Sequence, residues 1–303
     1  MVTQHEPAST DAPRQRLVVS TALSAPVVAM AMVGPHQFTH WQWISLTLAA
    51  PVIGWAAFPF HRAAWANLRQ GTATMDTLVS LGTLAAFGWS LYALLFGTAG
   101  RPGLSHPFEL TVRRMSGDGD LYLGVAAGIT TCALAGRYFE AESRRMTGTG
   151  RWVPPDTADR ISAVLVPSVL ALAAGTLTFW LGTGASVTMA CTAAVAVLIV
   201  ACPCALAAAA PAALLTGIER GVRLGQVSLV DVHPAESRGD TRIRLLERIA
   251  RTVKVNLFLA LACNVAALPL AAAGLLSPAL AGAAMVLSAV SVASNTLRLR
   301  TFR

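Results

Sequence analysis

The sequence predicts an all-α fold, a polytopic transmembrane helical bundle with eight spans. Composition gives the first indication: 54% of the 303 residues are hydrophobic and 13% are charged, whereas charged residues make up about 25% of an average soluble domain. The apolar residues also form eight runs that can cross a bilayer, for which about 20 residues are needed. These features indicate a membrane protein and leave little of the chain for a soluble domain.

The eight runs follow a polar segment, residues 1–15, which we expect to be a disordered cytoplasmic N-terminus. Arg14 and Arg16 before the first run resemble the start of a signal peptide, but seven further runs follow, so we interpret the first run as a span. Residues 16–303 then form one transmembrane domain. Its predicted spans are 17–34, 42–60, 74–97, 121–141, 160–182, 186–215, 253–273 and 277–297.

The positions of the basic residues explain the net charge of +8. If the N-terminus is cytoplasmic, eight spans place every Lys and Arg on the cytoplasmic side except Arg101, Arg113 and Arg114. This asymmetry is what the positive-inside rule requires of a membrane protein. We therefore expect a multi-pass protein of the cell membrane, in contact with lipid, with both termini in the cytoplasm and no nucleic-acid partner.

Two cytoplasmic connections are short. Residues 146–159, "MTGTGRWVPPDTAD", form a linker rich in Gly and Pro, and residues 216–252 form a charged linker whose last part is a basic amphipathic lead-in to the seventh span. Neither is large enough to bury a core of its own. We expect both to be shortened linkers between spans.

The sixth predicted span carries two cysteines around a proline, Cys202-Pro203-Cys204. On an ideal helix, residues two positions apart point in directions roughly 200° apart, so the two sulfurs would lie on opposite faces. Pro203 removes an N–H and clashes with the carbonyl of Ile199, which kinks or unwinds the helix. Two thiolates brought together by such a break form a soft metal site that suits Cu(I) or Ag(I) better than hard cations.

A structural interpretation of each cysteine is also open, because free Cys behaves as a small buried hydrophobe. We adopt it for Cys132 and Cys191, neither of which has a second cysteine close to it in sequence. All five cysteines fall within predicted spans, so disulfides are not expected. For the Cys-Pro-Cys triplet the coincidence of two thiols with a helix breaker favours metal binding.

The triplet and the stretch after it, "TGIERG", resemble the heavy-metal P-type ATPases, specifically the copper and silver exporters, in which Cys-Pro-Cys lies in the sixth of eight helices. Further stretches match that family in its order. These are "FPFHRAAWANLRQGTATMDTLVSLGT", "AAGITTCALAGRYFEAESRR", "ADRISAVLVP", "NVAALPLAAAGLL" and "NTLRLR". The resemblance implies binding and translocation of Cu(I), with Ag(I) next, as the bound and transported ion.

The resemblance also implies further ligands in the last two helices, where the family carries Tyr-Asn and a Met-x-x-Ser-Ser run. Asn264, Met285 and Ser288 match, whereas Cys263 replaces the tyrosine and Ala289 replaces the second serine. Cys263 would add a third thiolate. Read without the family, Met285 would be a packing residue and Asn264 an interhelical hydrogen-bonding residue.

An uptake site is implied at Met75, Glu140 and Asp159. The predicted topology supports this independently, because Met75 begins a span, Glu140 ends one and Asp159 begins the next, all at the cytoplasmic interface. Solvated charges at helix ends are the alternative, although ionisable groups this close to hydrocarbon are functional candidates by default.

Two further metal-related features are less specific. The family implies a copper-donor chaperone as partner, which docks at a Gly-Gly kink. In this sequence Ala56 and Ala57 replace the two glycines. A break in the helix there would therefore depend on Pro59. His36 and His40 lie four residues apart in an outer turn and are more typical of an ordinary wet loop than of a release site.

The sequence between the spans lacks the family's ATP-hydrolysing motifs, Asp-Lys-Thr-Gly-Thr and Thr-Gly-Glu, and contains no Gly-rich phosphate loop. Phosphoryl transfer needs phosphate contacts, magnesium ligands and an acceptor. We therefore expect no catalytic residue, no ATP or Mg site and no ATP hydrolysis. Two functions stay open: the metal-translocating membrane part of an exporter, or a degenerate or engineered structural and interaction bundle without transport activity.

Overall fold

The computed structural model describes residues 11–101, 121–147, 155–201, 216–217 and 239–298. Within these residues the fold is helical and contains no strand, which confirms the all-α prediction. The helices are α1 (Asp11–Met32), η1 (Gly34–His36), α2 (Trp41–Pro51), η2 (Val52–Ala56), α3 (Phe58–Arg69), α4 (Met75–Leu95), α5 (Leu123–Thr147), α6 (Pro155–Gly182), α7 (Val187–Val200), α9 (Gly239–Ala272) and α10 (Pro278–Leu297).

Four helical segments are long and apolar enough to cross a membrane, and a fifth candidate arises if the bent pair Trp41–Ala56 and Phe58–Arg69 counts as one span. The four are Pro13–Met32, Met75–Leu95, Ala163–Gly182 and Glu247–Ala272. The part of the chain that is described therefore supports a membrane bundle with four to five candidate spans, fewer than the eight predicted from the sequence.

Short polar turns separate the helices. Thr74 and Thr77 form a capping box at the start of α4, and the Thr74 N–H donates to the Thr77 hydroxyl at 3.1 Å. Ser186 and Ser277 cap α7 and α10 by accepting from the N–H groups of Met189 and Leu280. These caps satisfy N–H groups that a helix start leaves unpaired.

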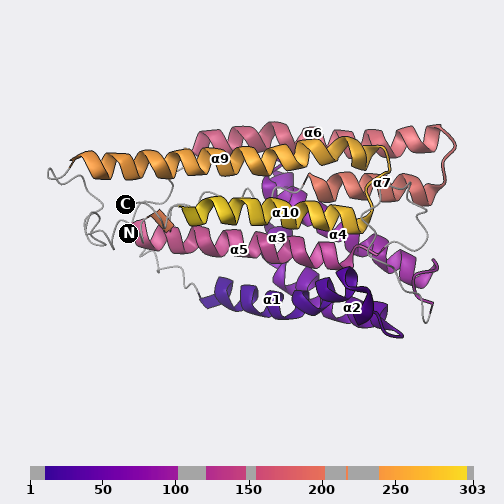
Figure 1. Ribbon diagram of the computed structural model, residues 1–303. Coiled ribbons are helices and arrows are strands. Elements are labelled where there is room, and N and C mark those ends of the chain that lie inside the picture. Colours follow the sequence, from indigo (N-terminus) through magenta and orange to yellow (C-terminus); the bar gives the residue numbers. More distant parts are fainter. Residues whose placement is uncertain (1–10, 102–120, 148–154, 202–215, 218–238, 299–303) are drawn as a thin grey trace, which may run out of the picture.

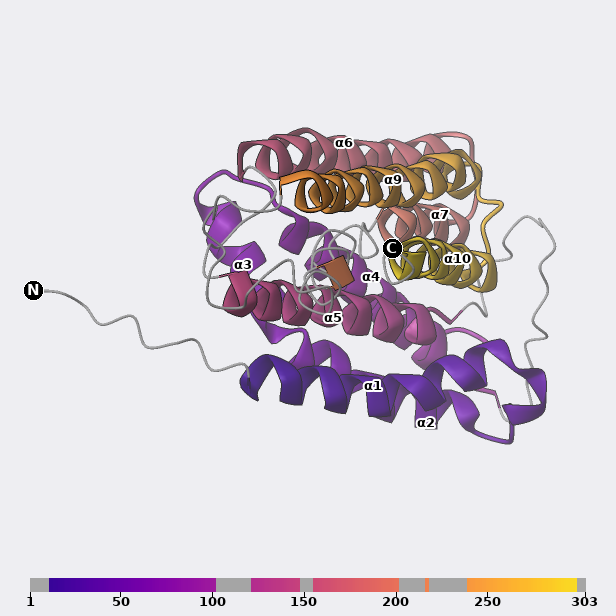
Figure 2. The same ribbon diagram turned by 60° about the vertical axis from the view of Figure 1, so that its left-hand side comes forward.

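The helices lie side by side in an elongated bundle (Figure 1). Viewed from the side, α1 and α2 form one edge, α6 and α9 form the opposite edge, and α4, α5, α7 and α10 lie between them (Figure 2). α1 packs mainly on α5, α6 on α7, and α9 on α10, while α4 contacts α3, α5 and α7. Helices distant in sequence therefore meet around α4 and α7.

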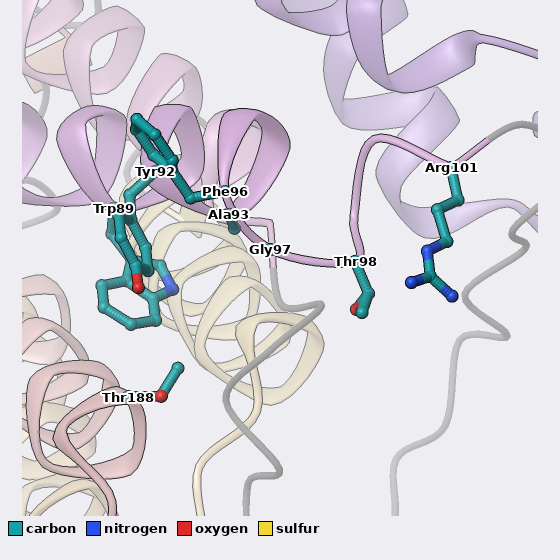
Figure 3. A pocket seen from close by; sticks show the side chains of 8 residues that line it. All are labelled: Trp89, Tyr92, Ala93, Phe96, Gly97, Thr98, Arg101 and Thr188. Carbon is teal, nitrogen blue, oxygen red and sulfur yellow. The ribbon is translucent and has the colours of Figure 1, made fainter.

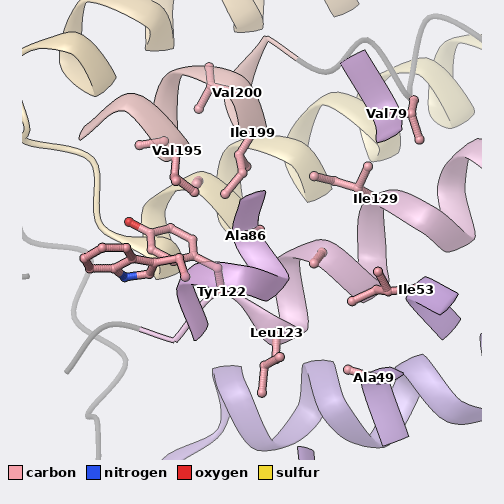
Figure 4. Packing of buried hydrophobic residues seen from close by; sticks show 14 of the residues in the cluster. Ala49, Ile53, Val79, Ala86, Tyr122, Leu123, Ile129, Val195, Ile199 and Val200 are labelled. Atoms are coloured by element: carbon pink, nitrogen blue, oxygen red, sulfur yellow. The ribbon is translucent and has the colours of Figure 1, made fainter. Parts of the chain in front are cut away.

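The core joins α4, α5 and α7 and is built from aliphatic and small residues. Ile199, Ile129 and Ala86 are fully buried in it, together with Tyr122 (Figure 4). Small residues permit close helix approach: a Cβ added at Gly124 of α5 would lie 2.9 Å from the Ala31 Cβ of α1. Such contacts are typical of helix pairs in membranes, where small residues let backbones approach.

The second predicted span, 42–60, differs from a straight helix. The Ala57 N–H donates to the Val52 carbonyl at 2.9 Å, five residues back, which makes η2 a π-helix, and α3 then departs at 49° and continues to Arg69. Pro59, in the first turn of α3, has no N–H to extend the earlier helix. The break expected at Pro59 thus forms at Ala57, although Ala56 and Ala57 replace the Gly-Gly pair.

Candidate metal centre

The end of α7 carries the predicted metal site. The helix runs from Val187 to Val200, and Ala201 is its C-cap with φ −71° and ψ −9°. Cys202, Pro203 and Cys204 follow directly and lie outside the described residues, so the predicted break at Pro203 stays a prediction. What the structure describes is the position from which the triplet departs.

That position is surrounded by three other helices. Ala201 is 3% exposed and belongs to one buried cluster with Leu78 of α4 and with Val166 and Val169 of α6. Leu268 of α9 packs against the same cluster. α4, α6 and α9 therefore converge where α7 ends and the cysteine triplet begins.

The ligands expected on α9 lie close to this convergence. Asn264 precedes Leu268 by four residues, so both lie on one face of α9, and Cys263 is its neighbour. The side chains of Cys263 and Asn264 are half-buried, and Cys263 is a free thiol. The structure thus places Asn264 one turn from a residue that packs against the end of α7.

On α10, Ser288 is 3% exposed, and its hydroxyl has no hydrogen-bond partner among the described residues. Buried hydroxyls normally have a partner, so an orphaned one needs an explanation. One explanation is that a lone pair of this oxygen faces a bound cation. Met285 lies one turn earlier on α10, but its side chain is outside the described residues; Ala289 is half-buried.

Two of the three expected uptake residues, Met75 and Glu140, belong to helix ends that meet. Met75 is the first residue of α4, and Leu78, three residues on, joins the cluster at the end of α7. Asp76 accepts a 2.7 Å hydrogen bond from Arg137 of α5, which places Met75 beside the turn that carries the exposed Glu140. Asp159 lies in the second turn of α6, and its side chain is outside the described residues.

Sequence reasoning missed several side chains at this end of the bundle. Arg137 lies over the ring of Phe60, and His61 bridges the Ile53 carbonyl and the Ser80 hydroxyl, each at 2.8 Å. The sequence could have drawn attention to Asp76, because it directly follows the predicted uptake residue Met75. The pairing across helices was not, because it depends on how α3, α4 and α5 pack.

The other end of the bundle is different in character. A cavity of about 230 Å³ lies between the end of α4 and the start of α7 and is lined by Trp89, Tyr92, Phe96, Arg101 and Thr188, among others (Figure 3). None of the predicted ligands lines it. His36 and His40 are both exposed, and no group of three His, Cys, Asp or Glu side chains suited to a metal occurs within the described ranges.

Comparison with known proteins identifies relatives among transport ATPases. The chain is 38% identical over 158 residues to a copper-exporting P-type ATPase of Mycobacterium tuberculosis, covering 50% of this chain and 20% of that protein. It is 37% identical over 139 residues to cation-transporting P-type ATPase B of Mycobacterium leprae, covering 45% and 18%. It is 33% identical over 158 residues to a copper-exporting P-type ATPase of Legionella pneumophila, covering 49% and 20%.

These matches confirm the predicted resemblance: about half of the chain is similar to part of heavy-metal P-type ATPases. The matched segment spans about a fifth of the length of those relatives. No family model matches the chain.

Proposed function

We propose that this chain binds Cu(I) within the membrane and forms the ion-translocating part of a P-type ATPase-like exporter. The observation that carries the proposal is the position of the Cys-Pro-Cys triplet, directly after α7 ends among α4, α6 and α9. The relatives named as copper exporters support copper as the ion.

The donor set favours a soft monovalent ion. Cys202, Cys204 and Cys263 would supply sulfur, with Met285, Asn264 and Ser288 as further ligands. Thiolate and thioether ligands select Cu(I) over hard cations such as Mg²⁺, and Ag(I) shares this chemistry. Ser288 supports the set because its hydroxyl is buried without a partner in the described part of the chain. The ion is the cargo, so Met75, Glu140 and Asp159 would pass it inward to these ligands.

The transport role includes the topology inferred from the sequence. We infer a cell-membrane protein with eight spans and with both termini in the cytoplasm. Helices overlap each of the eight predicted ranges, and the basic residues favour this orientation. A copper-donor chaperone is a candidate partner, because α3 departs at 49° after Ala56 and its Trp65 and Leu68 side chains are exposed.

ATP hydrolysis is not part of the proposal. The connections after α5 and α7 carry neither phosphorylation motif, so any pumping would depend on a motor supplied separately. The competing function, a structural bundle with a vestigial site, predicts no cysteine-dependent copper binding.

Titration of the purified chain with Cu(I) under reducing, anaerobic conditions separates the two functions. We expect the Cys202→Ala/Cys204→Ala variant to bind at least one Cu(I) fewer than the wild type. Cys132→Ala/Cys191→Ala is the matched control, because it also removes two thiols from predicted spans, and it should retain the wild-type stoichiometry. Equal stoichiometry in the wild type and the Cys202/Cys204 variant would rule out the proposed function.

A further inference from the structure

Arg137 is held from two sides at the end of the bundle where α4 begins. Its Nη2 donates to the Asp76 carboxylate at 2.7 Å. Its guanidinium carbon lies 4.1 Å from the centre of the Phe60 ring, and Phe60 is buried in the bundle. A planar guanidinium that pairs with a carboxylate and stacks on an aromatic ring loses most of its freedom. The positive charge of Arg137 is therefore fixed in place.

This fixed charge lies beside the proposed uptake residues. Asp76 directly follows Met75 on α4, and Arg137 precedes Glu140 by three residues, close to one turn of α5. The side chains of Arg137 and Asp76 are 35% and 27% exposed. They are neither deeply buried nor fully solvated, so their charges act on an ion that arrives from the water at this end.

The two charges oppose each other in their effect on a cation. Alone, the Arg137 guanidinium would repel a monovalent cation that approaches Met75. Alone, the Asp76 carboxylate would attract it. Together they nearly cancel, and Phe60 keeps Arg137 near this position even when Asp76 is neutralised.

We propose that Asp76 and Arg137 are a charge-compensated positioning pair that sets the rate at which a monovalent soft cation reaches the uptake site. This inference rests on the proposed copper-binding function and extends it to two residues that are not metal ligands. Its signature is an asymmetry of sign. Asp76→Asn removes one negative charge beside Met75 and slows loading, whereas Arg137→Gln removes one positive charge and does not slow it.

A purely structural ion pair would not produce this asymmetry. Both variants remove the same ion pair, so a purely structural role would lower the melting temperature and the loading rate in both. Only a role in the local field separates Asp76→Asn from Arg137→Gln. The asymmetry should also shrink at high ionic strength, because the Debye length falls from about 10 Å at 0.1 M salt to about 3 Å at 1 M.

The test is stopped-flow loading of the purified full chain with Cu(I) supplied as its cationic acetonitrile complex, followed by thiolate-to-copper absorption. At low salt, the loading rate of Asp76→Asn should be lower than that of the wild type by a factor of about three or more. The loading rate of Arg137→Gln should equal or exceed that of the wild type. The double variant Asp76→Asn/Arg137→Gln should return toward the wild-type rate. Arg101→Gln is the control, because Arg101 lines the cavity at the other end of the bundle.

Three outcomes decide the matter. Slow loading of Asp76→Asn alone, relieved by salt and by the second substitution, supports the positioning pair. Equal slowing of both single variants, or no change in either, overturns it while leaving cysteine-dependent copper binding intact. A wild type without cysteine-dependent absorption overturns the proposed function itself, and this inference with it.

Discussion

At the residue scale, Ser288 is one of three residues with a buried side-chain polar atom that has no hydrogen-bond partner among the described residues; the others are Ser45 and Trp89. The Ser288 hydroxyl is buried in α10 and lacks a partner among the described residues, whereas Ser291, one turn later, donates to the Leu287 carbonyl at 2.7 Å. An unsatisfied buried hydroxyl costs about 1–3 kcal/mol. In the proposed site, a bound Cu(I) would be the partner of this oxygen.

Ser288→Ala should therefore affect the two states of the protein in opposite ways. Without copper, the variant should be as stable as the wild type or more stable by up to about 1 kcal/mol, because a desolvated group is removed. With Cu(I), its gain in melting temperature should be smaller than that of the wild type. Thermal melts with and without Cu(I) check this, and Ser291→Ala is the control with no expected change in copper-dependent stabilisation. A variant that is strongly destabilised without copper would contradict this account of Ser288.

At the scale of elements, His61 ties three helices together at the bend. Its ring bonds the Ile53 carbonyl, which the five-residue register of η2 takes out of the normal helical pattern, and it bonds Ser80 of α4. Since the Ile53 carbonyl only accepts, the ring nitrogen facing it carries a proton. The bend is thus fixed by side chains of α3 and α4.

His61→Ala should loosen that bend. Two hydrogen bonds of about 1 kcal/mol each would be lost, with a backbone carbonyl left unpaired. Hydrogen exchange of the amides around Ala57 should become faster, while exchange in α7 should not change. Unaltered exchange near Ala57 would show that Pro59 and the π-turn hold the bend without His61.

The pair α1 and α5 offers a matched test of helix packing. Gly124→Ala would place a Cβ 2.9 Å from that of Ala31, whereas a Cβ at Gly128 of the same helix meets nothing within 4 Å. We expect Gly124→Ala to destabilise by about 1–3 kcal/mol through overpacking. Gly128→Ala should stabilise by about 0.5–1 kcal/mol, because alanine favours the helix. Melting temperatures that shift in the same direction would contradict this packing.

The last two helices are joined by a polar clasp. Asn256 of α9 is fully buried; its amide donates to Thr296 at 2.9 Å and accepts from Asn295 at 2.7 Å, both in α10. Asn256→Ala should lower stability by about 0.6–2 kcal/mol, the range found for interhelical hydrogen bonds in membranes. The half-buried Thr252 of the same helix provides a control, since Thr252→Ala breaks only a bond within α9. An equal loss in both variants would argue against the clasp.

At the scale of the whole molecule, the topology with eight spans is open to direct measurement. Thr72, between α3 and α4, and Thr183, between α6 and α7, are both exposed. In intact cells, a membrane-impermeant thiol reagent should label Thr183→Cys and should label Thr72→Cys only after lysis. Labelling of both positions in intact cells, or the reverse pattern, would contradict the inferred orientation.

The sequence allowed the helical class and the segments of most helices to be predicted, because long apolar runs are local signals. The runs at 74–97 and 277–297, which contain α4 and α10, are examples. The π-turn at Val52–Ala56 could not be predicted, since it depends on His61 reaching back from α3. The described helices support fewer candidate spans than predicted, because α5, for example, combines buried alanines with charges such as Arg137.

The residue types of the candidate metal ligands could be predicted from the sequence, but the side chains that surround them could not. Cys-Pro-Cys and Asn264 were identified from residue type and resemblance, which are independent of packing. The partnership of Arg137 with Asp76 and Phe60 required the packing of three helices, and so did the orphaned hydroxyl of Ser288. Long-range placement of this kind has no local signal in one sequence.

The central claim is that the sulfur atoms of Cys202 and Cys204 hold one soft ion inside the bundle. X-ray absorption at the copper edge of the Cu(I)-loaded chain tests it most directly. We predict at least two sulfur ligands in the wild type and fewer in Cys202→Ala/Cys204→Ala. A spectrum with only nitrogen and oxygen ligands, or one that the double substitution leaves unchanged, would contradict the claim.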